Sequence, residues 1–377
     1  MTKLRLYYAT NRRHVGDNRW RPESYDTAFS SDGMENLRLG KLSLEADSAR
    51  VERYFRKSTD AGRGDGEGLS GYLGKLAGND EAIDIRAFRE KLSSAHSDVN
   101  QPLSSKYGSS ALFAELQKVM TKSSDVLIYI HGYNVAWEDA VGSALALQEM
   151  LNRNEGAKKT TVVLFSWPSD GSALPFLAYR SDRADAESSG GSVGRAILKL
   201  RDFLMSLHQK DSALCGHELH LLCHSMGNYV MQNAISKIDQ HTPGPAMPRI
   251  FEHIFLCSSD VEDTVLETGQ PMGRLHELSR NVTVYYNSGD AALYVSDYTK
   301  GNSDRLGTAG SAHPNAVHNK VHQVDCSDVV GGVIEHSYYL SGRIADDISQ
   351  SIGGAKQFDD DRSRKQSPAA RNTWTMV

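Results

Sequence analysis

The chain of 377 residues contains only four cysteines, Cys215, Cys223, Cys257 and Cys326, and no two of them have CxxC spacing. They lie in or beside apolar stretches, so we expect reduced, buried thiols rather than a disulfide framework. The nearest approach to a metal-ligand cluster is HNKVHQVDC (318–326). Its alternation of polar and apolar residues is more typical of a strand with one polar face, so the sequence predicts no metal site.

The sequence also lacks an excess of charge of one sign. Its 42 basic and 47 acidic residues give a net charge of −5 and form no long single-sign run. This excludes the basic footprint expected of a protein that binds nucleic acid or anionic lipid. No uncharged apolar run approaches the roughly 20 residues needed to span a bilayer, and MTKLRLYYATNRR lacks the apolar core of a signal peptide. We therefore expect no integral membrane segment and a cytoplasmic location.

From about residue 120 onward, apolar runs of strand length alternate with stretches of helical periodicity. This pattern predicts an α/β fold with a mostly parallel central sheet and helices on both faces. Continuous apolar runs are typical of buried parallel strands. The expected strands are 124–132, 160–167, 217–224, 249–258, 281–288 and 320–326, and the expected helices are 135–152, 183–208, 226–238, 271–279, 291–297 and 341–352.

The remaining segments differ in composition from this core. KLRLYYAT and NLRLGKLSLEA near the N-terminus resemble two strands added to the same sheet. Residues 57–108 are rich in Gly, Ser, Asp and Lys, with one amphipathic helix expected around 82–95, and we interpret them as an insertion that could form a lid or cap. Residues 354–377 are polar without apolar periodicity, which predicts a loosely held tail after a single domain of residues 1–353.

One strand runs directly into a helix through a polar residue, in LHLLCHSMGNYVMQNAI (219–235). A Ser at such a turn projects its hydroxyl above the carboxyl edge of the sheet, where ligands collect in open α/β folds. Cys223-His224-Ser225-Met226-Gly227 keeps the second Gly of the G-x-S-x-G pattern and replaces the first by the small Cys223. We therefore predict that Ser225 is a nucleophile, and the alternative is a Ser that only caps the following helix.

A serine nucleophile needs a base and a carboxylate that orients the base, in the chain order Ser, acid, His. Asp290 follows the expected strand 281–288, and His336 lies in the loop after the last expected strand. Asp260, at the end of the strand before, is the competing acid, and Asp290 could also cap a short helix. His336 could instead be an ordinary surface histidine.

Acyl transfer also needs backbone N–H groups that bind the developing oxyanion. Met226 follows the nucleophile directly, and HGYN (131–134) follows the first core strand, so Tyr133 is the second expected donor, supported by Asn134. Other residues are candidates for the substrate pocket, although several could simply pack the core: His131, His224, Trp167, Tyr179 and Tyr338. Tyr179 and Asp182 could instead brace loops through hydrogen bonds.

Together these motifs resemble those of the α/β-hydrolase superfamily, closest to a bacterial branch of poorly characterised esterase/lipase-like proteins. The similar pieces span most of the chain: YYATNRR, LIYIHGYN, FSWPSDG, YRSDRADAESSG, HSMGNYV, SSDVEDTV, NSGDAAL and EHSYYL. The resemblance implies a serine hydrolase that acts on a carboxylic ester or related acyl bond without a cofactor. It assigns the triad to Ser225, Asp290 and His336.

The sequence thus predicts a serine esterase with a small-molecule or lipid-like acyl ester as substrate. The same triad could serve a thioesterase, lactonase, amidase or acyltransferase. A hydrolase fold that binds a partner without catalysis is an alternative of another class.

Overall fold

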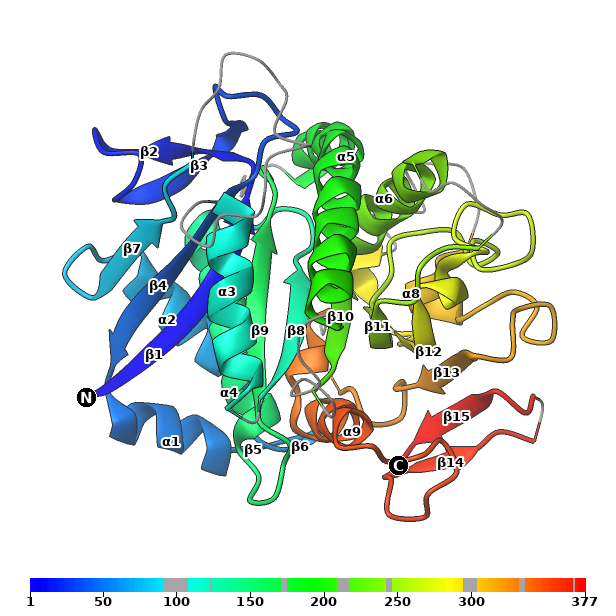
Figure 1. Cartoon of the computed structure of the whole chain (residues 1–377). Helices are drawn as coiled ribbons and strands as arrows, with labels where there is room; N and C mark the ends of the chain where they lie inside the picture. The colour runs from blue at the N-terminus through cyan, green and yellow to red at the C-terminus, as the bar shows by residue number, and fades with distance from the viewer. Residues whose placement is uncertain are drawn as a thin grey trace.

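The computed structural model describes residues 1–90, 108–122, 124–170, 175–208, 217–241, 246–293, 304–331, 336–368 and 370–377, except the side chains of 175–178 and 206–208. Eleven strands form one sheet in the order β14-β15-β13-β12-β11-β10-β8-β9-β1-β4-β7 (Figure 1). The bounds of these strands are β1 Thr2–Thr10, β4 Arg38–Ala46, β7 Ile83–Ala87, β8 Asp125–Ile130, β9 Thr160–Ser166, β10 Leu219–His224, β11 Phe251–Cys257, β12 Ser279–Tyr286, β13 Val321–Asp325, β14 Arg364–Gln366 and β15 Thr373–Met376.

The sheet is parallel through its centre. All pairings from β1 through β9, β8, β10, β11, β12 and β13 to β15 are parallel, whereas β4, β7 and β14 pair antiparallel at the two ends. Two small hairpins lie outside it, β2 (Arg12–Val15) with β3 (Ser24–Phe29), and β5 (Ser58–Thr59) with β6 (Gly62–Arg63). The predicted mostly parallel sheet with added N-terminal strands is confirmed.

Helices cover both faces of the sheet. One buried cluster contains residues of α1 (Ser48–Arg56), α2 (Gly66–Ala77), α4 (Trp137–Asn152), α9 (Gly342–Ile352) and the short η4 (Tyr338–Leu340). The cluster on the other face contains residues of α3 (Gly108–Met120), α5 (Pro175–His208), α6 (Gly227–His241), η3 (Leu275–Glu277) and α8 (Leu306–Ala309). Apolar strand residues therefore face a helical layer on either side, which explains their continuous apolar sequence.

Residues 57–108 differ from the expected insertion. The helix predicted around 82–95 is wrong at its start, because Ile83–Ala87 is strand β7, whose buried and exposed residues alternate with a period of two. The Gly-rich stretch before it forms α2, which packs closely on α4: a Cβ on Gly142 would lie 2.5 Å from the carbonyl oxygen of Ser70. Residues 91–107, where a lid was also expected, lie outside the described residues.

Three other elements differ from the sequence prediction. The helix expected at 271–279 is reduced to the 3-10 turn Leu275–Glu277, since β12 already begins at Ser279. The helix expected at 291–297 is helical over 291–293, and the rest lies outside the described residues. The tail expected to be loosely held carries β14 and β15, which extend the sheet and bury Trp374 (Figure 1).

Candidate active site

The turn after β10 holds Ser225 in an unusual backbone conformation. Its φ is +53°, which is strained for a residue with a Cβ and is typical of a nucleophile between a strand and a helix. Helix α6 begins two residues later at Gly227, where a Cβ would lie 2.5 Å from the carbonyl oxygen of Ile130. Only glycine therefore lets α6 start this close to the end of β8.

Asn228 braces this turn. Its Nδ2 donates to the carbonyl oxygens of Cys223 at 3.2 Å and Ser225 at 3.0 Å. Asn228 was not predicted from the sequence, although it directly follows S-M-G. Cys223 is fully buried on the face of the sheet that α6 covers, so a small apolar residue fits where the usual pattern has glycine.

The loop after β8 passes directly over the serine. A Cβ on Gly132 would lie 2.8 Å from Cβ of Ser225 and 3.2 Å from its Oγ. Among the described residues, this Oγ has no hydrogen-bond partner. The hydroxyl is thus held beside the backbone of the loop expected to bind an oxyanion, with its lone pairs unused.

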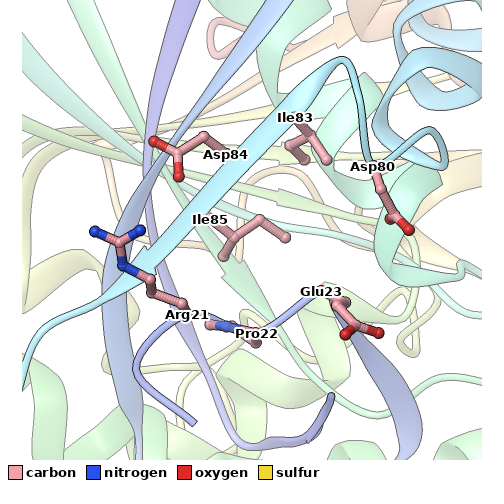
Figure 2. Close-up of a pocket in the computed structure, with 7 residues that line it drawn as sticks. All are labelled: Arg21, Pro22, Glu23, Asp80, Ile83, Asp84 and Ile85. Atoms are coloured by element: carbon pink, nitrogen blue, oxygen red, sulfur yellow. The ribbon is translucent and has the colours of Figure 1, made fainter. Parts of the chain in front are cut away.

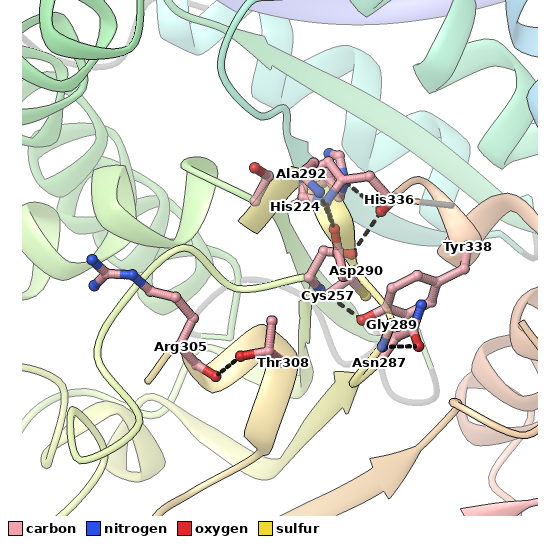
Figure 3. A network of polar contacts seen from close by, with 12 residues as sticks. His224, Cys257, Asn287, Gly289, Asp290, Ala292, Arg305, Thr308, His336 and Tyr338 are labelled. Carbon is pink, nitrogen blue, oxygen red and sulfur yellow. Dashed lines mark hydrogen bonds and ion pairs between the residues drawn. The ribbon is translucent and has the colours of Figure 1, made fainter. Parts of the chain in front are cut away.

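Asp290 and His336 are brought together by the ends of two different strands. Asp290 follows β12, is completely buried, and accepts Nδ1 of His336 with both carboxylate oxygens, at 2.8 and 3.0 Å (Figure 3). Its Oδ1 also accepts the backbone N–H of Ala292 at 3.2 Å. The carboxylate therefore caps the following turn and orients the imidazole at the same time, which are the two roles considered for it from the sequence.

The other imidazole nitrogen is unoccupied. Nε2 of His336 is buried and has no hydrogen-bond partner within the described parts of the chain, as is true of Oγ of Ser225. The contact with the carboxylate favours the tautomer with hydrogen on Nδ1, which leaves on Nε2 the lone pair that a general base needs. Contacts between nucleophile and base are often long without substrate and tighten in the reactive complex.

The main chain of His336 is also anchored. Its carbonyl oxygen accepts Oγ of Ser258 at 2.6 Å and Nε2 of His224 at 3.1 Å. Ser258 ends the neighbouring strand β11 with a left-handed φ of +47°. Burial holds the pKa of His224 well below its usual range, so this ring stays neutral 4.8 Å from the ring of His336.

Sequence reasoning missed Ser258. It lies two residues before Asp260 in SSDVED, and its local sequence does not predict a contact with His336. Its contact with His336 requires the end of β11 to lie beside the loop that follows β13, and the sequence does not show this adjacency.

A buried carboxylate holds the candidate oxyanion loop. Asp182 of α5 accepts the backbone N–H of Asn134 at 2.7 Å, Oγ of Ser169 at 2.6 Å and the N–H of Asp170 at 2.8 Å. Burial is the largest influence on the pKa of Asp182 and raises it. Asn134 itself has a φ of +56°. Asp182 thus braces the loops after β8 and β9, one of the roles considered for it from the sequence.

Arg12 also contacts the loops after β8 and β9, and it was not predicted from the sequence as a site residue. Its guanidinium donates to the carbonyl oxygen of Val135 at 2.7 Å, to Oγ of Ser166 at 2.9 Å and to the carbonyl oxygen of Ser169 at 3.3 Å. Burial lowers its pKa to about 10, partly offset by Asp182, so it remains a cation at neutral pH. The N-terminal strands therefore contribute directly to the shape of the site.

Tyr133 and Met226 flank Ser225 from the two loops expected to supply oxyanion donors. Tyr133 is half-buried, with its ring edge-on to Tyr179 at 5.6 Å, and Met226 is buried at the start of α6. Their backbone N–H groups are therefore the candidates for the oxyanion hole.

His131 and Trp167 are core residues. Nδ1 of His131 donates to the carbonyl oxygen of Gly132 at 2.8 Å, and its Nε2 accepts the N–H of Trp167 at 3.3 Å. The indole N–H donates to the carbonyl oxygen of His131 at 2.9 Å. Burial lowers the pKa of His131 to about 3, so it is a neutral brace rather than a second base.

The competing acid, Asp260, lies next to the serine but is directed elsewhere. Its carboxylate accepts the hydroxyl of Tyr179 at 2.9 Å and lies 3.6 Å from Nε of Arg305. Asp290 is the carboxylate that contacts the imidazole of His336. Tyr179 thus acts as the brace considered for it from the sequence.

Tyr338 is almost completely buried, so the structure does not bear out a place in an open pocket. Its hydroxyl donates to the carbonyl oxygen of Tyr285 at 2.8 Å and accepts the N–H of Ser258 at 3.1 Å. It stabilises the turn that presents His336 (Figure 3).

Among the residues that the structure describes, two groups of side chains have the spacing of metal ligands: Asp125 with Glu218 and His220, and Asp170 with Asp182 and Asp185. In the first, Nζ of Lys158 already lies 2.8 Å from Asp125. In the second, Asp182 is occupied by the three donors described above. Neither group includes Ser225, Asp290 or His336.

An open hollow of about 370 Å³ lies beside β7, an edge strand of the sheet (Figure 2). Arg21, Pro22, Glu23, Asp80 and Ile83–Ile85 line it. It contains none of the candidate site residues.

A comparison with protein-family models matches residues 109–348 to an alpha/beta hydrolase family of unknown function, DUF900. The match covers more than half of the chain and includes the strands and loops that carry the serine, the carboxylate and the imidazole. The chain belongs to this family of α/β hydrolases. A search of curated protein sequences gives no match.

The hydrolase fold therefore accounts for the parallel sheet and for the position of the site at the carboxyl ends of its strands. The matched region begins after α2 and β7, so these two elements lie outside the match. Within the described residues of this hydrolase, no helix is both long and apolar enough to cross a membrane.

Proposed function

We propose that this hydrolase is a serine esterase that cleaves a carboxylic ester through an acyl-enzyme intermediate. Its substrate is a small-molecule or lipid-like acyl ester, and no cofactor takes part. The proposal includes a cytoplasmic setting, consistent with the buried free thiols of Cys223, Cys257 and Cys326; Cys215 lies outside the described residues.

In the first half-reaction, Oγ of Ser225 attacks the acyl carbon while Nε2 of His336 takes its proton. The carbonyl oxygen becomes an oxyanion and accepts the N–H groups of Tyr133 and Met226. Collapse of this intermediate breaks the ester C–O bond, and the imidazolium returns the proton to the leaving alcohol. Asp290 keeps Nδ1 protonated and stabilises the imidazolium.

In the second half-reaction, His336 deprotonates a water molecule that attacks the acyl-enzyme. The new oxyanion occupies the same two N–H groups. Its collapse releases the carboxylic acid and returns the proton to Oγ of Ser225, so the resting enzyme is restored.

The observation that carries this proposal is the pairing of Asp290 with Nδ1 of His336, 2.8 Å apart, beside a serine in the left-handed conformation of a nucleophile turn. A serine that only capped a helix would not need a buried carboxylate–imidazole pair nearby. A lone surface histidine would not have its side chain and its carbonyl both fixed.

Fluorophosphonate labelling followed by intact mass measurement tests the proposal. Oγ of an activated Ser225 attacks phosphorus, fluoride leaves, and one adduct forms per chain. We expect this adduct in the native protein and none in Ser225→Ala. A folded native protein without an adduct would overturn the mechanism and favour a binding protein on a hydrolase fold. Undiminished ester turnover in Ser225→Ala would overturn it as well and assign the nucleophile to another residue.

A panel of oxygen esters, thioesters, lactones, amides and acceptor alcohols then decides the bond that is cleaved. The proposal expects oxygen esters to give the highest kcat/KM. A higher value for another class would keep the triad and change the substrate to that of a thioesterase, lactonase, amidase or acyltransferase.

A further inference from the structure

The C-terminal segment places two guanidinium groups inside the protein, away from the candidate active site. Arg362 lies between α9 and β14, and Arg364 is the first residue of β14. Only 1% of either side chain is exposed. Both approach Asp347 of α9: Nη2 of Arg362 is 2.7 Å from Oδ1, and Nη1 of Arg364 is 3.6 Å from Oδ2.

The charges of this cluster do not balance within the described residues. There, Asp347 is the only carboxylate in ion-pair distance of either guanidinium, so one negative charge faces two positive charges. The second oxygen of Asp347 also accepts the hydroxyl of Tyr285 at 2.7 Å. Burying a charge without a counter-charge costs several kcal/mol. The guanidinium carbon of Arg364 lies 5.0 Å from the ring centroid of Trp374, and this cation–π contact offsets part of the cost. A small anion would balance the remaining charge.

Some N–H donors of the two guanidinium groups have no hydrogen-bond partner among the described residues. Nη2 of Arg362 donates to Oγ of Ser351, and Nη2 of Arg364 donates to Oε1 of Gln357. Nη1 of Arg362 and Nε of Arg364 are buried without a hydrogen-bond partner among the described residues. Buried donors of this kind are rare unless a ligand, ion or water occupies them.

Two histidines of the sheet lie near these donors. His253 on β11 and His322 on β13 lie two residues before Phe255 and Val324, so alternation places them on the same face of the sheet, which α9 covers. Nδ1 of each has no partner in the described structure. Burial lowers the pKa of His253 to about 3 and that of His322 to about 4, and the positive charge of Arg362 contributes to both shifts. At neutral pH they add hydrogen-bonding capacity without further charge.

We propose that Arg362 and Arg364, together with His253 and His322, form a buried binding site for a small oxyanion of the phosphate or sulfate type. A guanidinium matches the geometry of such an oxyanion and makes short, charge-assisted hydrogen bonds to it. The anion balances the second arginine and fixes β14 and β15 to the sheet. The site lies toward the amino ends of the strands, whereas Ser225 lies at the carboxyl end of β10.

Thermal unfolding in inorganic phosphate, compared with chloride at equal ionic strength, tests this site. Since phosphate also stabilises proteins by general exclusion from their surface, the comparison needs variants. We expect phosphate to raise the unfolding midpoint of the native protein with a saturable dose dependence, as mass action requires. Arg364→Gln should lose the saturable part of this response.

Arg280→Gln is the matched control, because Arg280 is an exposed arginine in a surface ion pair with Glu252. It should keep the full phosphate response. An equal response in Arg364→Gln and in the native protein, or no advantage of phosphate over chloride, would overturn the proposal.

If Arg364→Gln does not fold, calorimetric titration of the native protein with phosphate and with sulfate decides the question. One saturable site per chain supports the proposal. The absence of saturable heat with either anion at millimolar concentration refutes it. Neither result depends on ester hydrolysis, so the two proposals fail independently.

Discussion

At the scale of single residues, three left-handed residues mark the site. Asn134, Ser225 and Ser258 are the non-glycine residues with positive φ in the described structure, and each lies just beyond the carboxyl end of one of the adjacent strands β8, β10 and β11. Such strain persists only where the surrounding structure holds it, and it gathers at functional sites. Here it turns three loops toward one point above the sheet.

The first prediction concerns the acid. Asp290→Asn should lower kcat by about 10³ to 10⁴, because an amide does not hold the imidazole as its Nδ1–H tautomer or stabilise the imidazolium. Asp260→Asn should cost less than about tenfold, since the carboxylate of Asp260 bonds to Tyr179 rather than to His336. Steady-state kinetics on one ester substrate compares the two variants. A larger loss in Asp260→Asn would move the acid to the end of β11.

At the scale of elements, the loop that carries His336 is set by its neighbours. The hydroxyl of Ser258 and the imidazole of His224 both hold the carbonyl oxygen of His336, while η4 follows directly and fixes the turn through Tyr338. The base is therefore positioned from β10, β11 and β12 together. The contacts that position it come from residues distant in the sequence.

The second prediction follows from that anchoring. Ser258→Ala removes the 2.6 Å hydrogen bond to the carbonyl oxygen of His336, so the imidazole is less well placed for proton transfer. We expect kcat to fall roughly tenfold or more with little change in KM, and fluorophosphonate labelling to slow in parallel.

Ser259→Ala is its control. Oγ of this neighbouring serine is buried and has no hydrogen-bond partner in the described structure, so its removal should leave kcat unchanged. Equal losses in Ser258→Ala and Ser259→Ala would show that the effect is general packing rather than positioning.

A third prediction concerns the contact between α2 and α4. In Gly142→Ala the new Cβ would lie 2.5 Å from the carbonyl oxygen of Ser70 and 2.6 Å from the backbone N of Gly74, so the helices must separate. We expect the free energy of unfolding to fall by about 1–3 kcal/mol in urea denaturation.

Gly71→Ala on α2 is the matched control, because a Cβ there meets nothing within 4 Å. It should stabilise the protein by up to about 1 kcal/mol through helix propensity. If both substitutions are neutral, α2 is not packed on α4 as the structure has it.

At the scale of the whole molecule, the apolar core around the sheet also contains buried polar and charged side chains. Neutral histidines are buried at both ends of the strands, with His131 and His224 near the candidate site and His253 at the opposite end. Arg12 and Arg362 are fully buried cations at separate places in the fold. This composition predicts that stability depends on pH.

The fourth prediction is acid sensitivity. Burial lowers the pKa of His131 and of His253 to about 3 in the folded protein, against about 6.5 in an unfolded chain. Below about pH 6.5 these histidines bind protons in the unfolded state but not in the folded state. The free energy of unfolding therefore falls as pH falls toward 3. Each histidine should cost on the order of 1–2 kcal/mol at about pH 5.

Urea denaturation at neutral pH and near pH 5 measures this loss, and His253→Phe should reduce it. Asp185 acts in the opposite direction, because burial raises its pKa to about 6 and its folded form takes up a proton early. An unchanged free energy of unfolding between the two pH values would contradict the burial of these neutral imidazoles.

The amino-acid pattern was sufficient to predict the central strands and the serine turn. Continuous apolar runs identified all six central strands, and the S-M-G turn after one of them marked Ser225, because a strand that enters a helix through a small-residue turn needs only local chemistry to be recognised. Chain order placed Asp290 and His336 after later strands. Asp290 and His336 are in contact in the structure, and the catalytic roles of all three residues remain predictions.

Contacts between segments that are distant along the chain could not be predicted before the fold was known. Arg12 reaches Val135, Ser258 reaches His336 and Asp182 reaches Asn134, and in each case the partners are adjacent only after the sheet has formed. The polar C-terminal segment joins the sheet through the pairing of β15 with β13, and its two buried arginines approach Asp347 of α9. Local composition carries no record of such partners, since hydrogen bonds and ion pairs between strands depend on strand order and register.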